Sequence, residues 1–330
     1  FKATKTSVRR DINGNVRIDE NGDVVTYEKK IFPDLTYLNC SESRNLRSIP
    51  SYTGLTTLYC DDCTSLMTIP DTLVHLTTLF CCDCPEITTI PSGLVALTKL
   101  VCNDCSNLMT IPDTLVALTF LSCRVCESLE TIPGGLVALT ELSCDYCVRL
   151  TTIPGDLVSL TNLSCNTCIS LTAIPGALVN LTTLRCDECI SLTTIPDAFV
   201  NLTTLSCNDC ESLTTIPGGL LALTNLSCNN CTILTTIPGT LVNLTTLSCN
   251  NCESLTTIPG TFVNLTDLSC DSCESLTTIP DGLLKLNQLS CMSCENLTII
   301  SGGLVELEDL DCSNCESLTE IPNTFTKLSK

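Results

Sequence analysis

The sequence predicts an elongated β-solenoid, and three observations lead to this prediction. A unit of about 21 residues occurs fourteen times in succession, as residues 202–222 (LTTLSCNDCESLTTIPGGLLA) and 244–264 (LTTLSCNNCESLTTIPGTFVN) illustrate. Each unit contains a short stretch in which apolar and polar residues alternate, and nearly every unit carries a proline at one later position. A strict period in this range indicates units that bury their apolar side only by stacking on their neighbours.

The chain divides into three parts in this interpretation: residues 1–34, the fourteen repeats over residues 35–327, and a short tail at 328–330. The first part contains Asn13-Gly14 and Asn21-Gly22 between short runs of β-branched residues. Asn-Gly pairs favour tight hairpin turns. We therefore expect an N-terminal cap of β-hairpins that covers the first repeat.

Each repeat is numbered here from its first leucine. Positions 1, 4, 12, 15 and 19 are aliphatic nearly throughout, and positions 6 and 9 are cysteine. Leucine at 4 and cysteine at 6 give a period of two, which predicts a strand over positions 3–7 with 4 and 6 inward and 3, 5 and 7 outward. Stacked repeats should join these strands into one parallel sheet.

The return half of each repeat contains proline at position 16, except in the thirteenth repeat, where Ser301 replaces it. Proline lacks the backbone N–H that a helix interior requires. We therefore expect extended or polyproline-like backbone with short turns opposite the sheet.

These motifs resemble the leucine-rich repeat. The motif L-x-x-L-x-C-x-x-C-x-x-L followed by I-P-x-x-L is similar to that of the short, bacterial-type class. The Cys-rich units also resemble leucine-rich repeat proteins of large amoeba-infecting viruses. The resemblance implies a right-handed solenoid whose sheet forms the concave face. Position 9 in that family is usually asparagine or cysteine, whereas position 6 is usually leucine, so cysteine at position 6 is a departure.

The Cys-x-x-Cys pairs admit three interpretations: buried free thiols, a row of sites for thiophilic metal ions, or disulfides. We favour free thiols, without cofactor or metal, because both cysteines fall on inward positions. Twenty-eight free thiols would indicate a reducing compartment, the cytoplasm, or alternatively packaging in a viral particle. Cys82 stands at outward position 7 and is the candidate reactive thiol.

Function in such a solenoid is expected on the outward positions of the sheet. The first six repeats carry bulky side chains there, which are typical anchors for a protein partner: Tyr37, Tyr59, Phe80, Val101, Phe120 and Tyr146. Charged residues accompany them, namely Asp61, Asp83, Asp104, Lys99 and Arg124. We therefore predict a protein partner with a basic patch opposite these acids.

The net charge of −20 disfavours nucleic acid and anionic membranes as partners. The single histidine, His75, lies away from the predicted strands, so no Ser/His/Asp or Cys/His constellation can form and we expect no enzyme. Three alternatives to partner recognition stay open. They are a structural component, virion parts included, that self-associates through the end near Lys330, a thiol or metal store, and an ice-binding array of threonines.

Overall fold

The computed structural model describes residues 5–8, 26–29 and 35–328. The two short segments form an antiparallel pair, β1 (Lys5–Val8) with β2 (Thr26–Lys29). Both predicted Asn-Gly turns, at residues 13–14 and 21–22, lie outside the described residues. Within residues 1–34, for which a cap is predicted, the structure describes only this strand pair.

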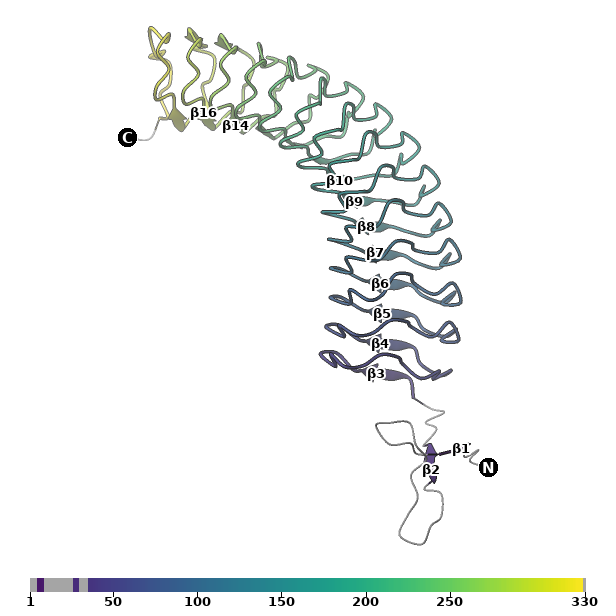
Figure 1. The fold of residues 1–330 in the computed structure, drawn as a ribbon. Coiled ribbons are helices and arrows are strands. Elements are labelled where there is room, and N and C mark those ends of the chain that lie inside the picture. Colours follow the sequence, from purple (N-terminus) through teal and green to yellow (C-terminus); the bar gives the residue numbers. More distant parts are fainter. Residues whose placement is uncertain (1–4, 9–25, 30–34, 329–330) are drawn as a thin grey trace.

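Residues 35–328 form a solenoid whose stacked turns follow an arc (Figure 1). One parallel sheet of fourteen strands runs through the stack, each strand paired in register with the next repeat. Near the C-terminal end, strands β14 and β16 lie on the inner side of the arc (Figure 1). The strands are β3 (Tyr37–Asn39), β4 (Thr57–Tyr59), β5 (Thr78–Phe80), β6 (Lys99–Val101), β7 (Phe120–Ser122), β8 (Glu141–Ser143), β9 (Asn162–Ser164), β10 (Thr183–Arg185), β11 (Thr204–Ser206), β12 (Asn225–Ser227), β13 (Thr246–Ser248), β14 (Asp267–Ser269), β16 (Gln288–Ser290) and β18 (Asp309–Asp311). The predicted parallel β-solenoid is confirmed.

Each strand is shorter than predicted and covers only positions 3–5 of its repeat. The reason lies at position 8, where the backbone is left-handed in all fourteen repeats, with φ between 53° and 63°. A residue in this region cannot continue a strand, so the chain turns directly after position 5. Position 7 therefore belongs to the turn that follows the strand.

The core consists of the same positions in every repeat. The aliphatic residues at 1, 4, 12, 15 and 19 and the cysteines at 6 and 9 are buried throughout the central repeats. Phe199 and Phe262 fill position 19 and are fully buried. Burying one such side chain contributes roughly 1.5–3 kcal/mol, so each repeat is stabilised mainly by contact with its two neighbours.

On the return side of the stack, short parallel pairings join the backbones of neighbouring repeats. This side contains no helix within residues 35–328. Strands β15 (Thr278–Ile279) and β17 (Ile299–Ile300) pair in parallel, and single bridges such as Thr131 to Thr152 occur in other repeats. The extended return segments follow from the prolines at position 16. Among the described residues, no helix has the length and apolar character required to cross a membrane.

Candidate recognition surface

Four aromatic residues and a lysine form a continuous row across the first five strands. The rings of Tyr37 and Tyr59 lie 5.7 Å apart and tilted, and those of Tyr59 and Phe80 are stacked at 4.7 Å. The Lys99 ammonium lies over both the Phe80 and Phe120 rings, 5.3 and 4.9 Å from their centroids. We call these five residues the aromatic–lysine row.

The row arises because in-register strands bring the outward positions 3 and 5 of successive repeats side by side, so contacts form both directly and diagonally across the strands. Tyr59 on β4 pairs with Phe80 on β5, and Lys99 on β6 pairs with Phe120 on β7. Stacked rings contribute about 0.5–1.5 kcal/mol and an exposed cation–π contact about 0.5–1 kcal/mol. These contacts hold the side chains in place before any partner arrives.

Val101 is almost fully buried, so the expectation that its side chain is exposed is wrong. It stands at outward position 5, in register between Phe80 and Ser122, yet only 9% of its surface is accessible. Its larger neighbours in the row shield it from solvent.

Acidic residues at the turns border the row. Asp83 and Asp104 occupy the left-handed position 8 of successive repeats, with Asp62 before them and Asp61 beside it. Partial burial, followed by the neighbouring carboxylates, raises the pKa of Asp83 above its usual range. Asp61 also accepts a hydrogen bond from the backbone N–H of Cys82 at 2.8 Å. The border thus presents concentrated negative charge.

Of two further predicted site residues, Arg124 lies in the same repeat as Phe120 and Tyr146 lies in the next one. Arg124 forms an ion pair with the buried Asp145, Nε to Oδ2 at 3.2 Å, so part of its charge is neutralised. Tyr146 occupies position 8 of its repeat and is 46% exposed. Neither has a ring contact with the row among the described residues.

The later repeats carry a hydrogen-bond ladder that the sequence reading missed. Asn208 at position 7 accepts from the N–H of Asn229 at 2.8 Å and from the hydroxyl of Ser227 at 2.7 Å, both in the next repeat. Asn229 and Asn250 do the same for their following repeats. The detectable signal was Asn or Asp at position 7 followed by serine at position 5 of the next unit.

Threonines at position 2 are engaged in a similar way, since Thr203 and Thr224 each donate to the carbonyl of the preceding repeat at 3.0 Å. The serines and asparagines of the sheet also bond to one another. These internal bonds engage the hydroxyls at positions 2 and 5 of the later repeats.

The cysteines form two rows of buried hydrogen-bond donors. At position 9, the Cys210 thiol donates to the Cys186 carbonyl of the preceding repeat at 3.1 Å. At position 6, the Cys207 thiol donates to the Ser227 carbonyl of the next repeat at 3.5 Å. All cysteines of the described residues are free thiols. Cysteine at position 6 thus adds a second donor to a carbonyl that already accepts the backbone N–H of the same cysteine, at 2.9 Å for Cys207 to Ser227.

The electrostatics of the position-6 thiols keep them protonated, whereas the hydrogen bond to the position-6 thiol lowers the pKa of Cys84 and Cys147 at position 9. The hydrogen bond with the next repeat's position-9 thiol, together with burial, raises the pKa of Cys81, Cys102 and their counterparts. Burial also raises the pKa of half-buried Cys82 to about 12, and this argues against its prediction as a reactive thiol. No group of three or more potential ligands suited to a metal ion occurs in the part of the chain that the structure describes.

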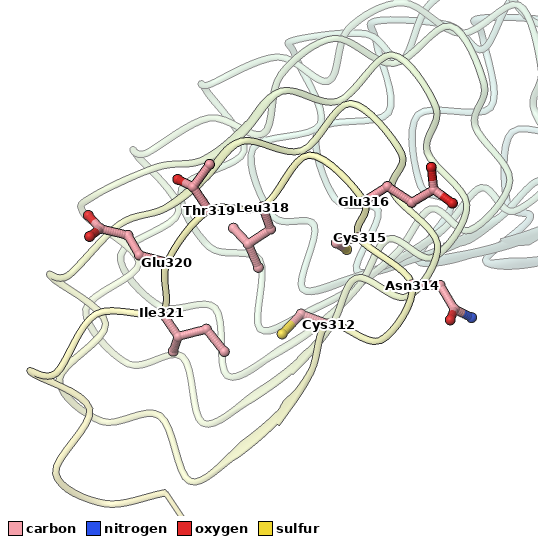
Figure 2. A pocket seen from close by; sticks show the side chains of 8 residues that line it. All are labelled: Cys312, Asn314, Cys315, Glu316, Leu318, Thr319, Glu320 and Ile321. Carbon is pink, nitrogen blue, oxygen red and sulfur yellow. The ribbon is translucent and has the colours of Figure 1, made fainter.

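The C-terminal end of the stack exposes core positions. A hollow of about 570 Å³ is lined by Cys312, Cys315, Leu318 and Ile321, with Glu316 and Glu320 among the residues around it. Figure 2 shows Leu318 pointing into the turn while Glu316 and Glu320 point away from it. The hollow thus combines apolar side chains with two carboxylates.

Comparison with known proteins places this architecture. A sequence model of the leucine-rich repeat matches residues 306–328. The functional domain of InlJ from Listeria monocytogenes, described as including a cysteine ladder, superposes with a TM-score of 0.68 and 25% identity, over 93% of this chain and 69% of that one. The chain has the fold of leucine-rich repeat proteins, and residues 306–328 match the repeat itself. A leucine-rich repeat protein of Leptospira interrogans, LIC12759, is more distant, with a TM-score of 0.49 and 18% identity over 86% and 91% of the two chains. No curated protein sequence matches significantly.

Proposed function

We propose that this leucine-rich repeat protein is a non-catalytic recognition module that binds a protein partner through its sheet, with the aromatic–lysine row as the energetic centre. The observation that carries the proposal is the row itself, an apolar surface already held in one arrangement by ring stacking and cation–π contacts. A surface that is ordered before binding loses little conformational freedom on association.

The chemistry of the border defines the partner. Asp62, Asp83 and Asp104 stand in successive turns beside the row, and partial burial together with the neighbouring carboxylates raises the pKa of Asp83. A partner that brings lysine or arginine side chains to this border would relieve the repulsion. We propose a partner segment with an apolar centre that covers Tyr59 and Phe80 and basic residues directed toward the aspartates.

The thiols bear on where this binding takes place. Two rows of buried thiol hydrogen bonds require protonated, reduced cysteines. We propose a reducing compartment, the cytoplasm, as the site of action, with the interior of a viral particle as the alternative.

The proposal is tested by replacing both central rings, Tyr59→Ser and Phe80→Ser. Serine is what later repeats carry at position 5, so the solenoid accepts it there. Proteins captured by the wild-type chain are quantified against those captured by the double variant and by the control Ser227→Ala. Losing a hot spot of about 2 kcal/mol or more weakens binding by about 30-fold.

The expected result is a protein retained by wild type and control but lost from the double variant, whose circular dichroism stays unchanged. Retention of every captured protein by the double variant would contradict the proposal.

A further inference from the structure

An exposed aliphatic stripe runs along the solenoid, apart from the sheet. Position 20 is valine or leucine in every repeat from the second to the thirteenth, and each of these side chains is 40–55% exposed. The stripe consists of Val74, Val95, Val116, Val137, Val158, Val179, Val200, Leu221, Val242, Val263, Leu284 and Val305. The first and last repeats have threonine instead, Thr53 and Thr326. We call these twelve residues the aliphatic stripe.

The stripe is built on a fixed backbone. The side-chain amide of Asn180 donates to the Val158 carbonyl of the preceding repeat at 2.8 Å, and Asn243 donates in the same way to Leu221. Ser159 forms the equivalent bond to Val137. Where position 21 is asparagine or serine, it therefore holds the backbone of position 20 of the preceding repeat.

The size of the stripe matches a stable protein interface. Twelve half-exposed aliphatic residues present on the order of 800 Å² per chain, about what one partner contributes to an interface of standard size. A single folded chain rarely exposes an apolar patch of more than a few hundred Å².

The distribution of charge around the aliphatic stripe indicates which molecule binds to it. The chain carries a net charge of −20, so most of its surface repels a second copy. Positions 20 and 21, however, carry only valine, leucine, alanine, serine and asparagine between residues 95 and 264. An identical chain also offers an identical repeat spacing, so side chains of two stripes can interdigitate along their whole length. We infer that the aliphatic stripe is the contact between two copies of this chain, related by a two-fold axis.

The test uses two charged versions of the four central stripe residues. These four residues lie at the middle of the stripe. In either a parallel or an antiparallel two-fold dimer, they therefore face the same four residues of the second copy. One variant carries glutamate and the other lysine at all four positions, namely Val158, Val179, Val200 and Leu221. A control carries glutamate at four exposed threonines of the return side in the same repeats, Thr151, Thr172, Thr193 and Thr214.

Sedimentation velocity over a range of concentrations is expected to show the wild type and the control at twice the 35.4 kDa chain mass. Each stripe variant alone should sediment at the mass of one chain, and an equimolar mixture of the two should recover the dimer through opposite charges. Added salt should strengthen the wild-type dimer, because it screens the repulsion between acidic surfaces.

A wild-type chain that sediments as a monomer throughout, or a glutamate variant that still dimerises, would overturn the inference. So would a monomeric wild type that binds phosphatidylcholine vesicles and loses this binding in the glutamate variant, because the stripe would then serve a lipid surface. The aromatic–lysine row is unchanged in all variants, so the proposed recognition stands or fails separately.

Discussion

The second and third repeats differ from the tenth and eleventh at the same outward positions of one regular sheet. At position 5 the early repeats have Tyr59 and Phe80, whose rings stack, whereas the later ones have Ser227 and Ser248, whose hydroxyls bond to the preceding asparagine. The later surface therefore satisfies its own polar groups. The early surface leaves apolar area uncovered, and only such uncovered area can gain free energy from a partner.

The comparison shows that a uniform fold need not give a uniform binding capacity. Position 7 illustrates this, since Asn208 accepts two hydrogen bonds from the next repeat while Asp61 accepts one. An aromatic residue at position 5 removes the hydroxyl that would make the second bond. The gain in binding surface thus comes with a loss of internal hydrogen bonds.

The largest expected effect concerns what both regions share, the buried thiols. Twelve position-6 thiols, from Cys60 to Cys291, are buried, and all have a raised pKa. Their stabilising contribution is complete below the unfolded-state thiol pKa of about 8.5 and is lost as pH rises toward the folded-state values. Each thiol then lowers the free energy of unfolding by up to about 1.4 kcal/mol per pH unit.

Together, twelve such thiols can lower the free energy of unfolding, over about one pH unit, by more than its typical value of about 5–15 kcal/mol. We therefore expect cooperative loss of the sheet between about pH 9 and 10. Circular dichroism under reducing conditions measures the transition, and peptide-resolved hydrogen exchange should show both regions opening at the same pH. Replacing Cys207 and Cys228 by alanine should make the pH dependence less steep. An intact sheet well above pH 10 would contradict the prediction.

A smaller effect distinguishes the two regions directly. Asn208→Ala leaves the Asn229 N–H and the Ser227 hydroxyl without their acceptor, which should lower the free energy of unfolding by about 2–3 kcal/mol. Asp61→Ala removes one bond and also a carboxylate that repels Asp83, so we expect about 1 kcal/mol or less. Urea denaturation measures both. Equal losses would mean that the ladder contributes nothing beyond a single bond.

The smallest expected effect lies at position 8. Val125 holds a φ of 57°, which is unfavourable for a β-branched side chain, whereas asparagine tolerates it. Val125→Asn should raise the free energy of unfolding by about 1 kcal/mol. Ser272→Val, at a φ of 53° in a later repeat, should lower it by a similar amount. Thermal unfolding measures the change in Tm of each variant. Changes of the same sign in the two variants would contradict the prediction.

Much of the fold could be predicted because burial is periodic. Leucine at position 4 and cysteine at position 6 identified the strand and its inward face, and both positions are buried in the central repeats. The left-handed turn at position 8 was missed because residues as different as Asp62, Tyr146 and Thr167 occupy it. The burial of Val101 was missed for another reason: it depends on the size of neighbours in adjacent repeats, which alternation within one strand does not encode.

The directions of the thiol bonds have a mechanical consequence. Cys207 at position 6 donates forward to the next repeat, and Cys210 at position 9 donates backward to the preceding one. Every turn is therefore fastened to both neighbours inside the core, in addition to the bonds of the sheet. Tension along the axis is shared between two parallel sets of bonds, so the arc should behave as a stiff spring that extends by opening turns from its ends rather than by parting in the middle.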